Sequence, residues 1–252
     1  MLTSARQKHI EELIRKNGEV VISVLAKELG VSVETVRRDI NALSDAGRLV
    51  KVHGGAVSAN RPIAESQYEK RRLEGSQIKE RLGAVAAQRI GDSDVIALSA
   101  GSTMEGIARH ITDKPDVTVV TNSTAVAATV KAQCHCVLLG GQLHAEEGYT
   151  FGPVTVDQLA HFHTDTAFVS ASAVTADGLM TTRIEEGDLH RKMMENAAHV
   201  VLVVQSAKLG ARSVYRFADL EAVDEIITDG ETPIDPEFEK LLTALGIRLH
   251  VV

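Results

Sequence analysis

The sequence predicts an α/β protein of two domains: an N-terminal winged helix-turn-helix domain, then a doubly wound, largely parallel α/β domain. Three observations support this. Apolar residues recur at helical spacing early in the chain, with a glycine-containing turn between two helices. Later, continuous Val/Ile/Leu runs alternate with helical stretches, which is typical of strands covered on both faces. With 252 residues, 44% of them hydrophobic, the chain is long enough for both domains.

The first domain is predicted over residues 1–57 and begins with three helices. An amphipathic helix over 5–16 precedes a second over 22–29, which Gly30 ends because glycine tolerates positive φ. Ser32 caps the third helix. The apolar residues of that helix share one face: Val33, Val36, Ile40 and Leu43.

The opposite face of the third helix is polar and carries two adjacent arginines. In a helix-turn-helix the second helix of the pair enters the DNA groove. A solvated helix face is the plainer interpretation of paired arginines, but the capped turn and the buried stripe favour DNA contact. Asp39 points away from this face and is expected to support the structure. The expected DNA contacts of the helix are Ser32, Glu34, Thr35, Arg37, Arg38 and Asn41.

A small β-wing is predicted over residues 48–57, where apolar alternation is followed by Gly54-Gly55. Basic side chains of such a wing lie near DNA phosphates. We therefore add Lys51 and His53 to the expected DNA contacts.

The net charge of −7 is unevenly divided. Residues 1–57 carry 9 Lys+Arg and 7 Asp+Glu, whereas the remainder carries 18 and 27. Such a small positive charge supports only weak binding of one domain to DNA. We therefore expect a homo-oligomer, a dimer or tetramer, that places two such domains on one DNA. No apolar run reaches membrane-spanning length and no signal peptide is visible, so a cytoplasmic protein without a membrane partner is expected.

Residues 58–75 are predicted to form a linker, since Ser58 to Pro62 is polar and lacks apolar anchors. The second domain is expected over 76–252. Its predicted strands are 95–99, 117–121, 135–139, 166–170, 200–204, 225–229 and 248–251. Its predicted helices are 102–110, 123–132, 155–163, 185–197 and 236–245.

The two cysteines, Cys134 and Cys136, fall in one predicted buried strand. The spacing places both thiols on the same face, and no second pair lies near them in the sequence. A structural role is therefore expected, with no metal site and no disulfide. No cofactor and no catalytic residue are predicted.

Loops at the carboxyl ends of parallel strands collect ligands in sheets of this kind. The loop after the first strand combines Gly101 with hydroxyl side chains at a helix start, an arrangement that binds anions. Polar or glycine-containing loops follow the next two strands, and a lysine follows a later one. Each feature alone is explained by helix capping or by a turn. Together they predict a phosphate-bearing small ligand that contacts Ser99, Gly101, Ser102, Thr103, Asn122, Ser123, Gly140, Gly141 and Lys208, with Arg183 as a further candidate.

Both domains also carry a family resemblance. In the first, the matching residues are Ser32-x-x-Thr35-Val36-Arg37-Arg38-Asp39-Ile40-x-x-Leu43, then Gly47 and Val52-His53-Gly54-Gly55-Ala56. In the second, they include Ala100-Gly101-Ser102-Thr103, Val119-Val120-Thr121-Asn122-Ser123, Leu138-Leu139-Gly140-Gly141, Gly152-Pro153, Asp177-Gly178, Glu185-Glu186, Ser206-x-Lys208 and Ile227-Thr228-Asp229. Over nearly its whole length the chain resembles the DeoR family of bacterial transcription regulators.

The resemblance implies a transcription factor, by family habit a repressor, with an effector domain similar to ribose-5-phosphate isomerase A, glucosamine-6-phosphate deaminase and CoA transferases. It implies a phosphorylated sugar or polyol as inducer, and adds Lys79, Asp177 and Glu185 to its expected contacts. Three positions differ from what relatives often have. Ser99 stands in place of an acidic residue, Gln205 in place of an Asp, and His190 in place of a Lys. These departures predict an inducer outside the commonest sugar phosphates.

The alternative function is enzymatic: a sugar-phosphate isomerase or deaminase that carries a DNA-binding domain. Glu185, Glu186, Asp177 and Lys208 supply acid–base groups. However, no pair of them has a spacing diagnostic of catalysis, and the departures at Ser99 and Gln205 weaken this alternative. Turnover of a candidate sugar phosphate would distinguish the two functions.

Overall fold

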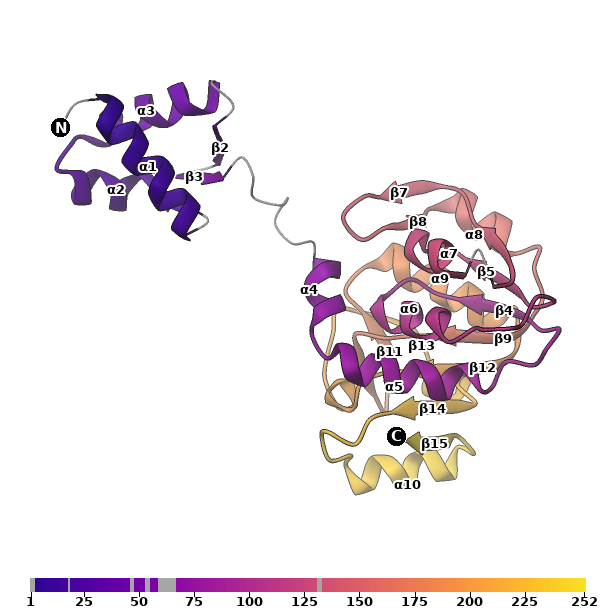
Figure 1. The fold of residues 1–252 in the computed structure, drawn as a ribbon. Coiled ribbons are helices and arrows are strands. Elements are labelled where there is room, and N and C mark those ends of the chain that lie inside the picture. Colours follow the sequence, from indigo (N-terminus) through magenta and orange to yellow (C-terminus); the bar gives the residue numbers. More distant parts are fainter. Residues whose placement is uncertain (1–2, 18, 46–47, 53–54, 59–66, 131–132) are drawn as a thin grey trace. The chain divides into compact units, whose positions relative to one another are not determined.

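The computed structural model describes residues 3–17, 19–45, 48–52, 55–58, 67–130 and 133–252 (Figure 1). The chain divides into two compact units, Met1–Glu65 and Ser66–Val252. The division falls inside the predicted linker 58–75. The second part of that stretch forms a helix, α4 (Gln67–Leu73), which belongs to the second unit.

The first unit combines three helices with a three-stranded antiparallel sheet of order β1-β3-β2. The elements in chain order are α1 (Thr3–Asn17), β1 (Glu19–Val21), α2 (Ile22–Leu29), α3 (Val33–Asp45), β2 (Leu49–Val52) and β3 (Gly55–Ser58). The three helices and the β2–β3 wing agree with the predicted winged helix-turn-helix. The short strand β1 was not predicted.

The core of the first unit lies between its helices and the wing. Val36, Ile40 and Leu43 of α3 are buried in it, together with Ile10 of α1, as their spacing predicts. The prediction for Val33 is wrong, because its side chain is 43% exposed. Val33 is the first residue of α3 and precedes the part of the helix that packs on the core.

A seven-stranded parallel sheet of order β15-β14-β12-β9-β4-β5-β6 forms the centre of the second unit. The strands are β4 (Val95–Leu98), β5 (Thr118–Thr121), β6 (His135–Leu138), β9 (Thr164–Val169), β12 (Ala197–Val203), β14 (Glu225–Thr228) and β15 (Arg248–Val251). All seven fall where strands were predicted. From β4 the chain winds towards β6 at one edge, and from β9 it winds towards β15 at the other.

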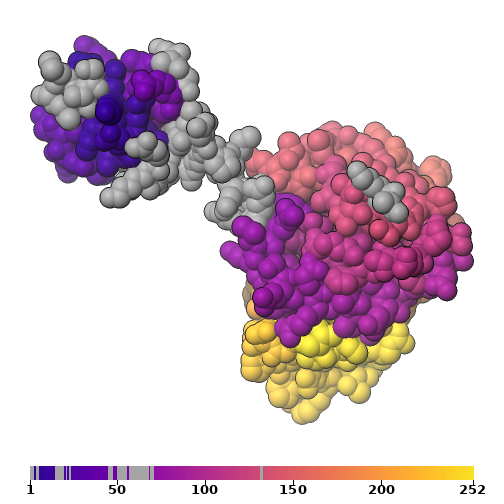
Figure 2. Space-filling model, in the orientation of Figure 1, coloured from indigo at the N-terminus to yellow at the C-terminus, as the bar shows by residue number. Residues whose placement is uncertain are grey.

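Helices cover both faces of this sheet (Figure 1). One core contains residues of α5 (Ser76–Ala87), α6 (Ser102–Arg109) and α7 (Thr124–Val130). The other contains residues of α8 (Pro153–Leu159), α9 (Ile184–Glu195) and α10 (Pro236–Ala244). Successive residues of β4 point into opposite cores, Ile96 and Leu98 into the first and Ala97 into the second. In Figure 2 the C-terminal residues, in yellow, form the edge of this unit at β15.

Two antiparallel additions were not predicted. A hairpin pairs β7 (Gln142–His144) with β8 (Tyr149–Phe151). A small sheet of order β10-β11-β13 contains β10 (Ala173–Thr175), β11 (Gly178–Thr181) and β13 (Tyr215–Ala218), and α9 packs against both β13 and the main sheet. These strands have three or four residues, and their sequences contain no apolar run long enough to mark them.

The expectation that Cys134 and Cys136 lie in a buried strand is wrong. Strand β6 is at the edge of the sheet, so both cysteines are only partly buried and His135 between them is exposed. Both thiols are free, and burial raises the pKa of each. Among the described helices, none has the length and apolar character that crossing a bilayer requires.

Candidate functional site

The turn between α2 and α3 fixes where the third helix begins. Gly30 adopts φ +64°, a conformation that favours glycine, and the N–H of Val31 donates to the carbonyl of Ala26 at 3.1 Å. Ser32 then caps α3, since its Oγ accepts a hydrogen bond of 3.1 Å from the N–H of Thr35. The start of α3 is therefore held by both the backbone and a side-chain cap.

We call the outward side of α3 the arginine face, composed of Glu34, Thr35, Arg37, Arg38 and Asn41. Arg37 and Arg38 are 50% and 80% exposed. The Glu34 carboxylate lies 3.0 Å from Arg37 Nη1 and 3.9 Å from Arg38 Nε. Exposed ion pairs of this kind contribute about 0–1 kcal/mol, so both guanidinium groups can leave Glu34 for DNA.

Asp39 faces the interior, as predicted. Its carboxylate is buried and accepts hydrogen bonds from Arg6 Nε at 2.5 Å and Gln7 Nε2 at 3.4 Å, both on α1. Asp39 therefore ties α3 to α1 and sets the rotation of the arginine face.

The wing contacts stay predictions. Strand β2 pairs with β3, and Lys51 lies opposite Ala56 in this ladder. The side chain of Lys51 and the whole of His53 lie outside the described residues.

In the second unit, a cavity of about 470 Å³ lies beyond the carboxyl ends of β4 and β9. These two strands are neighbours in the sheet, and the winding direction reverses between them. Ligands of doubly wound sheets bind at such a switch point. The residues that follow β4 (100–103) and β9 (170–172) line the cavity, and we call it the effector cavity.

Charged side chains from distant parts of the chain meet in the effector cavity. The cations are Arg71 of α4, Lys79 of α5, Arg183 and Lys208. The carboxylates are Glu74, Glu147 and Glu186. Two of these charges are paired, since the Arg71 guanidinium contacts the Glu147 carboxylate.

The start of α6 forms one wall of this cavity. Gly101 precedes the helix at φ +135°, which is a glycine conformation, and leads directly into Ser102 and Thr103. The first N–H groups of a helix have no partner within the helix and attract anions. These N–H groups and the Thr103 side chain lie at the cavity wall, whereas the Ser102 hydroxyl donates to the carbonyl of Arg71 at 3.3 Å.

The two cavity lysines are poised to bind an anion. Burial, and then the neighbouring charge of Arg71, lower the pKa of Lys79. Burial, and then Lys79 and Arg71, lower the pKa of Lys208 to about 8, although Glu186 acts in the opposite direction. A bound anion would relieve this mutual repulsion, so the cavity favours negatively charged ligands.

Close packing of α5 on α6 brings Lys79 to the cavity. A Cβ on Gly83 would lie 2.4 Å from the backbone carbon of Gly106. A Cβ on Gly106 would lie 2.7 Å from the carbonyl oxygen of Lys79. The two helices therefore approach so closely only because both positions are glycine.

Another part of the cavity wall offers polar groups without a partner. Among the described residues, nothing hydrogen-bonds the buried hydroxyl of Tyr149 or either ring nitrogen of the buried His190. Burial lowers the pKa of His190 and so favours its neutral form, which both donates and accepts. Nearby, Thr181 donates to a Glu186 carboxylate oxygen at 2.5 Å. Unpaired buried polar groups in a cavity wall are suited to ligand hydroxyls.

The structure brings six of the thirteen expected effector contacts into this cavity: Lys79, Gly101, Ser102, Thr103, Arg183 and Lys208. The other seven lie elsewhere: Ser99, Asn122, Ser123, Gly140, Gly141, Asp177 and Glu185. Asp177 and Glu185 line two other surface hollows, the first beside α10 and the second beside α8.

Structural roles occupy several residues outside the cavity. Asn122 donates to the carbonyl of Thr150 at 2.9 Å, and Ser123 accepts from the N–H of Val126 at 3.2 Å, which caps α7. Gly140 bonds to Gln158 of α8 at 2.8 Å. These residues follow β5 and β6, away from the switch point, which explains why their loops do not reach the cavity.

Several cavity residues were not on the predicted list. Gln205 and His190 had been noted only as departures from the family pattern, and Glu186 only as a family match and as an acid–base group of the enzyme alternative. Tyr149 and Glu147 come from the unpredicted hairpin, and no sequence signal marked them. The remaining additions are Arg71, Glu74, Ala100, Ser170, Ala171, Ser172, Thr181 and Thr182. No group of His, Cys, Asp and Glu side chains suited to a metal ion occurs among the described residues.

Comparison with known proteins agrees with this division of the chain. Residues 6–61 match the DeoR-like helix-turn-helix domain, and residues 74–230 match the DeoR C-terminal sensor domain. The chain is 29% identical over 253 residues to the HTH-type transcriptional repressor GlcR of Bacillus subtilis, covering 100% of this chain and 97% of that one. It is 29% identical over 237 residues to the glycerol-3-phosphate regulon repressor of Escherichia coli, covering 93% and 94%. Ribose 5-phosphate isomerase A of Methanocaldococcus jannaschii is similar over 54% of this chain and 55% of its own, with 20% identity and a TM-score of 0.39.

A winged helix with an exposed arginine face, joined to a sensor domain, defines a DNA-binding transcriptional regulator. The chain belongs to the DeoR family of such regulators. The enzyme alternative is not supported, because the relatives matched over nearly their whole lengths are named as repressors.

Proposed function

We propose that this regulator represses a carbohydrate-catabolism operon and that a phosphorylated sugar or polyol in the effector cavity releases it from operator DNA. The convergence of Arg71, Lys79 and Lys208 beside the start of α6 carries this proposal. Cations and free N–H groups at one point suit a phosphate group. The name of one relative, the glycerol-3-phosphate regulon repressor of Escherichia coli, supports the same class of ligand.

The remainder of the ligand carries hydroxyl groups. The unpaired Tyr149 hydroxyl, the neutral His190 ring and the Glu186 carboxylate line the cavity and offer both donors and acceptors. Relatives often have charged residues where Gln205 and His190 stand here. We therefore infer an inducer outside the commonest hexose phosphates.

DNA binding requires more than one copy of the chain. The first domain carries little net positive charge, so a homo-oligomer of two or four copies, with paired arginine faces on one operator, gives useful affinity. The effector then favours a state in which the paired faces no longer match the operator spacing. Because operator DNA lies in the cytoplasm of a prokaryotic cell, we expect this activity there.

A ligand panel tests the proposal. The panel contains sn-glycerol 3-phosphate, ribose 5-phosphate, fructose 1-phosphate, glucose 6-phosphate and each unphosphorylated counterpart. One phosphorylated compound is expected to raise the melting temperature and to dissociate the protein from DNA upstream of its own and neighbouring genes in a gel shift. At about 100 times its Kd it adds about 2.7 kcal/mol of stability.

Variants and controls sharpen this test. Lys208→Met is expected to lose the response, whereas Lys240→Met, which removes an exposed lysine of α10, is expected to keep it. A response to the unphosphorylated counterparts alone would contradict the proposal. Tightest binding of glucose 6-phosphate would overturn the inferred specificity, and turnover of any compound would restore the enzyme alternative.

A further inference from the structure

We propose that Arg71 is an effector-binding residue through which the ligand fixes α4, the helix nearest the DNA-binding unit along the chain, onto the sensor unit. This inference rests on the proposed function and adds to it the route by which ligand occupancy reaches the DNA-binding unit. Arg71 is the residue of α4 whose backbone and side chain contact residues that line the effector cavity.

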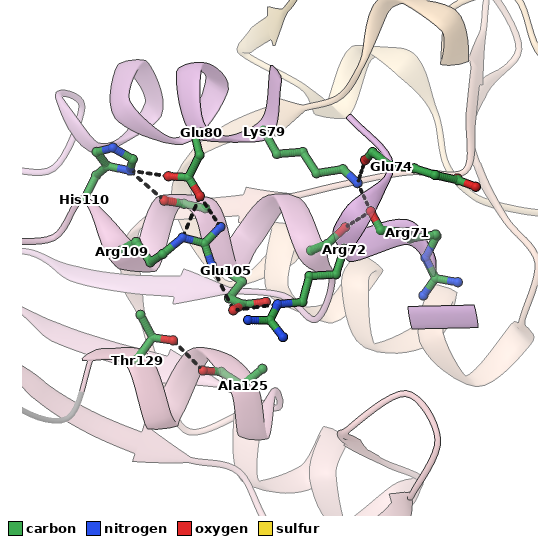
Figure 3. Close-up of polar contacts among 12 residues, drawn as sticks. Arg71, Arg72, Glu74, Lys79, Glu80, Glu105, Arg109, His110, Ala125 and Thr129 are labelled. Carbon is green, nitrogen blue, oxygen red and sulfur yellow. Dashed lines mark hydrogen bonds and ion pairs between the residues drawn. The ribbon is translucent and has the colours of Figure 1, made fainter. Parts of the chain in front are cut away.

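Residues that line the cavity contact both the backbone carbonyl and the guanidinium group of Arg71. Its carbonyl oxygen accepts hydrogen bonds from Lys79 Nζ and, at 3.3 Å, from Ser102 Oγ. Lys79 Nζ also donates to the carbonyl of Glu74 at 2.6 Å (Figure 3). The guanidinium of Arg71 pairs with Glu147. Each of these residues lines the effector cavity, so the end of α4 is part of the cavity wall.

Polar contacts dominate the attachment of α4. Tyr68 donates to a carboxylate oxygen of Glu105 on α6 at 2.7 Å. Arg72 Nε lies 3.6 Å from the same carboxylate (Figure 3). Leu73, by contrast, is 67% exposed. A helix of seven residues is not stable by itself and depends on such contacts. The position of α4 therefore responds to changes in a few hydrogen bonds.

An anion in the cavity strengthens this attachment. Arg71, Lys79 and Lys208 come from α4, α5 and the turn after β12, and their like charges oppose one another. A phosphate between them replaces repulsion with attraction and bridges α4 to the sheet. The guanidinium has five donors, so it binds a phosphate oxygen while one of its edges stays on Glu147.

The consequence extends along the chain. Only residues 59–66 separate α4 from β3, the last strand of the DNA-binding unit. When α4 is fixed, the point at which the linker to each DNA-binding unit starts is fixed as well. The ligand-bound state thus loses arrangements that the free protein uses to match its operator.

Hydrogen exchange of the full-length protein tests the proposal, with sn-glycerol 3-phosphate, fructose 1-phosphate and inorganic phosphate as probes. A probe is expected to slow amide exchange both at residues 101–103 and within α4. Protection at 101–103 without protection of α4 overturns this inference alone. If no probe protects 101–103, the proposed function fails and this inference fails with it.

Three variants separate ligand contact from structural support. Arg71→Met is expected to weaken probe binding by about 10-fold or more and to abolish protection of α4, while protection at 101–103 persists at saturation. Arg81→Met, which removes an exposed arginine of α5 that lies outside the cavity and outside the contacts of α4, is expected to stay within about 2-fold of the wild type. Glu147→Gln is expected to tighten probe binding by about 3-fold, because it removes a carboxylate that competes for Arg71.

The sign of the Glu147→Gln effect is decisive. If the Arg71–Glu147 pair only supports the fold, both single variants weaken binding. Opposite signs therefore contradict a purely structural role of the pair, and the loss of α4 protection in Arg71→Met then tests the contact between Arg71 and the ligand. Wild-type affinity in Arg71→Met, with melting temperature unchanged, would also refute the proposal.

Discussion

The arginine face and the effector cavity are built in opposite ways. The arginine face comes from about two turns of one helix, its two arginines are exposed, and its buried neighbour Asp39 supports it from behind. The effector cavity draws on α4, α5, α6, α9 and several loops, and many of its groups are buried. Binding and stability are therefore separable on the first surface and coupled in the second.

The largest expected effect tests this separation on α3. Arg37→Ala combined with Arg38→Ala is expected to weaken operator binding by about 100-fold or more, since each arginine contact contributes about 1–3 kcal/mol. The melting temperature is expected to stay unchanged, because both side chains are exposed. Gel shifts and thermal unfolding measure the two quantities, with Arg81→Ala, an exposed arginine of α5, as the control. Unchanged operator affinity, or a clear loss of stability, would contradict the assignment.

The opposite behaviour is expected at the α5–α6 contact. Gly106→Ala places a Cβ against the Lys79 carbonyl and is expected to cost about 1–3 kcal/mol of unfolding free energy. Because Lys79 moves with α5, ligand affinity should fall in the same variant. Gly230→Ala, whose Cβ would only touch a Val251 methyl at 3.4 Å, is the matched control. Loss of stability without loss of ligand affinity would break the proposed coupling.

An intermediate effect concerns pH. The pKa of Lys208 is lowered to about 8 in the free protein, and a bound phosphate raises it again. Above pH 8 the ligand must therefore bind together with a proton, so its affinity is expected to fall by up to about 10-fold per pH unit between pH 8 and 9.5. Calorimetry at several pH values measures this fall. Lys208→Arg, which stays charged, is expected to flatten the profile, and an equally steep profile in this variant would refute the role of Lys208.

The smallest expected effect is also the most specific. Tyr149→Phe removes a buried hydroxyl without a partner among the described residues. The variant is expected to melt at a slightly higher temperature, because an unpaired buried hydroxyl destabilises the fold. Its affinity for a sugar phosphate should fall by about 2- to 12-fold, while its affinity for inorganic phosphate stays the same. An equal loss for both ligands would show that Tyr149 does not contact the sugar.

The same contrast explains what the sequence could predict. The residues of the arginine face lie within one short segment of helix. Helical periodicity alone therefore separates them from the buried Val36 and Ile40. Most of the seven parallel strands were found because apolar residues concentrate in them and in their flanks, whereas β15 (Arg248–Val251) alternates polar and apolar residues. The short antiparallel strands of the second unit contain no such apolar run.

The cavity was predicted in part. Its phosphate-binding wall follows β4 directly, and local chemistry at Gly101 and Ser102 was enough to find it. The loops after β5 and β6 have similar composition but lie away from the switch point, which depends on the order of strands in the sheet. Arg71 and Tyr149 reach the cavity from segments with no ligand-binding pattern, so only the three-dimensional structure identifies them.

The hydrogen bonds between Asp39 and α1 hold α3 from the side opposite to the arginine face. One side of the helix is tethered, so the substitution of positions 34, 35, 37, 38 and 41 leaves its orientation in place. If these five residues contact the operator as we predict, exchanging them for those of a relative is expected to transfer that relative's operator preference, provided that Asp39 and Arg6 are retained. We then expect the ligand to which the protein responds to stay the same.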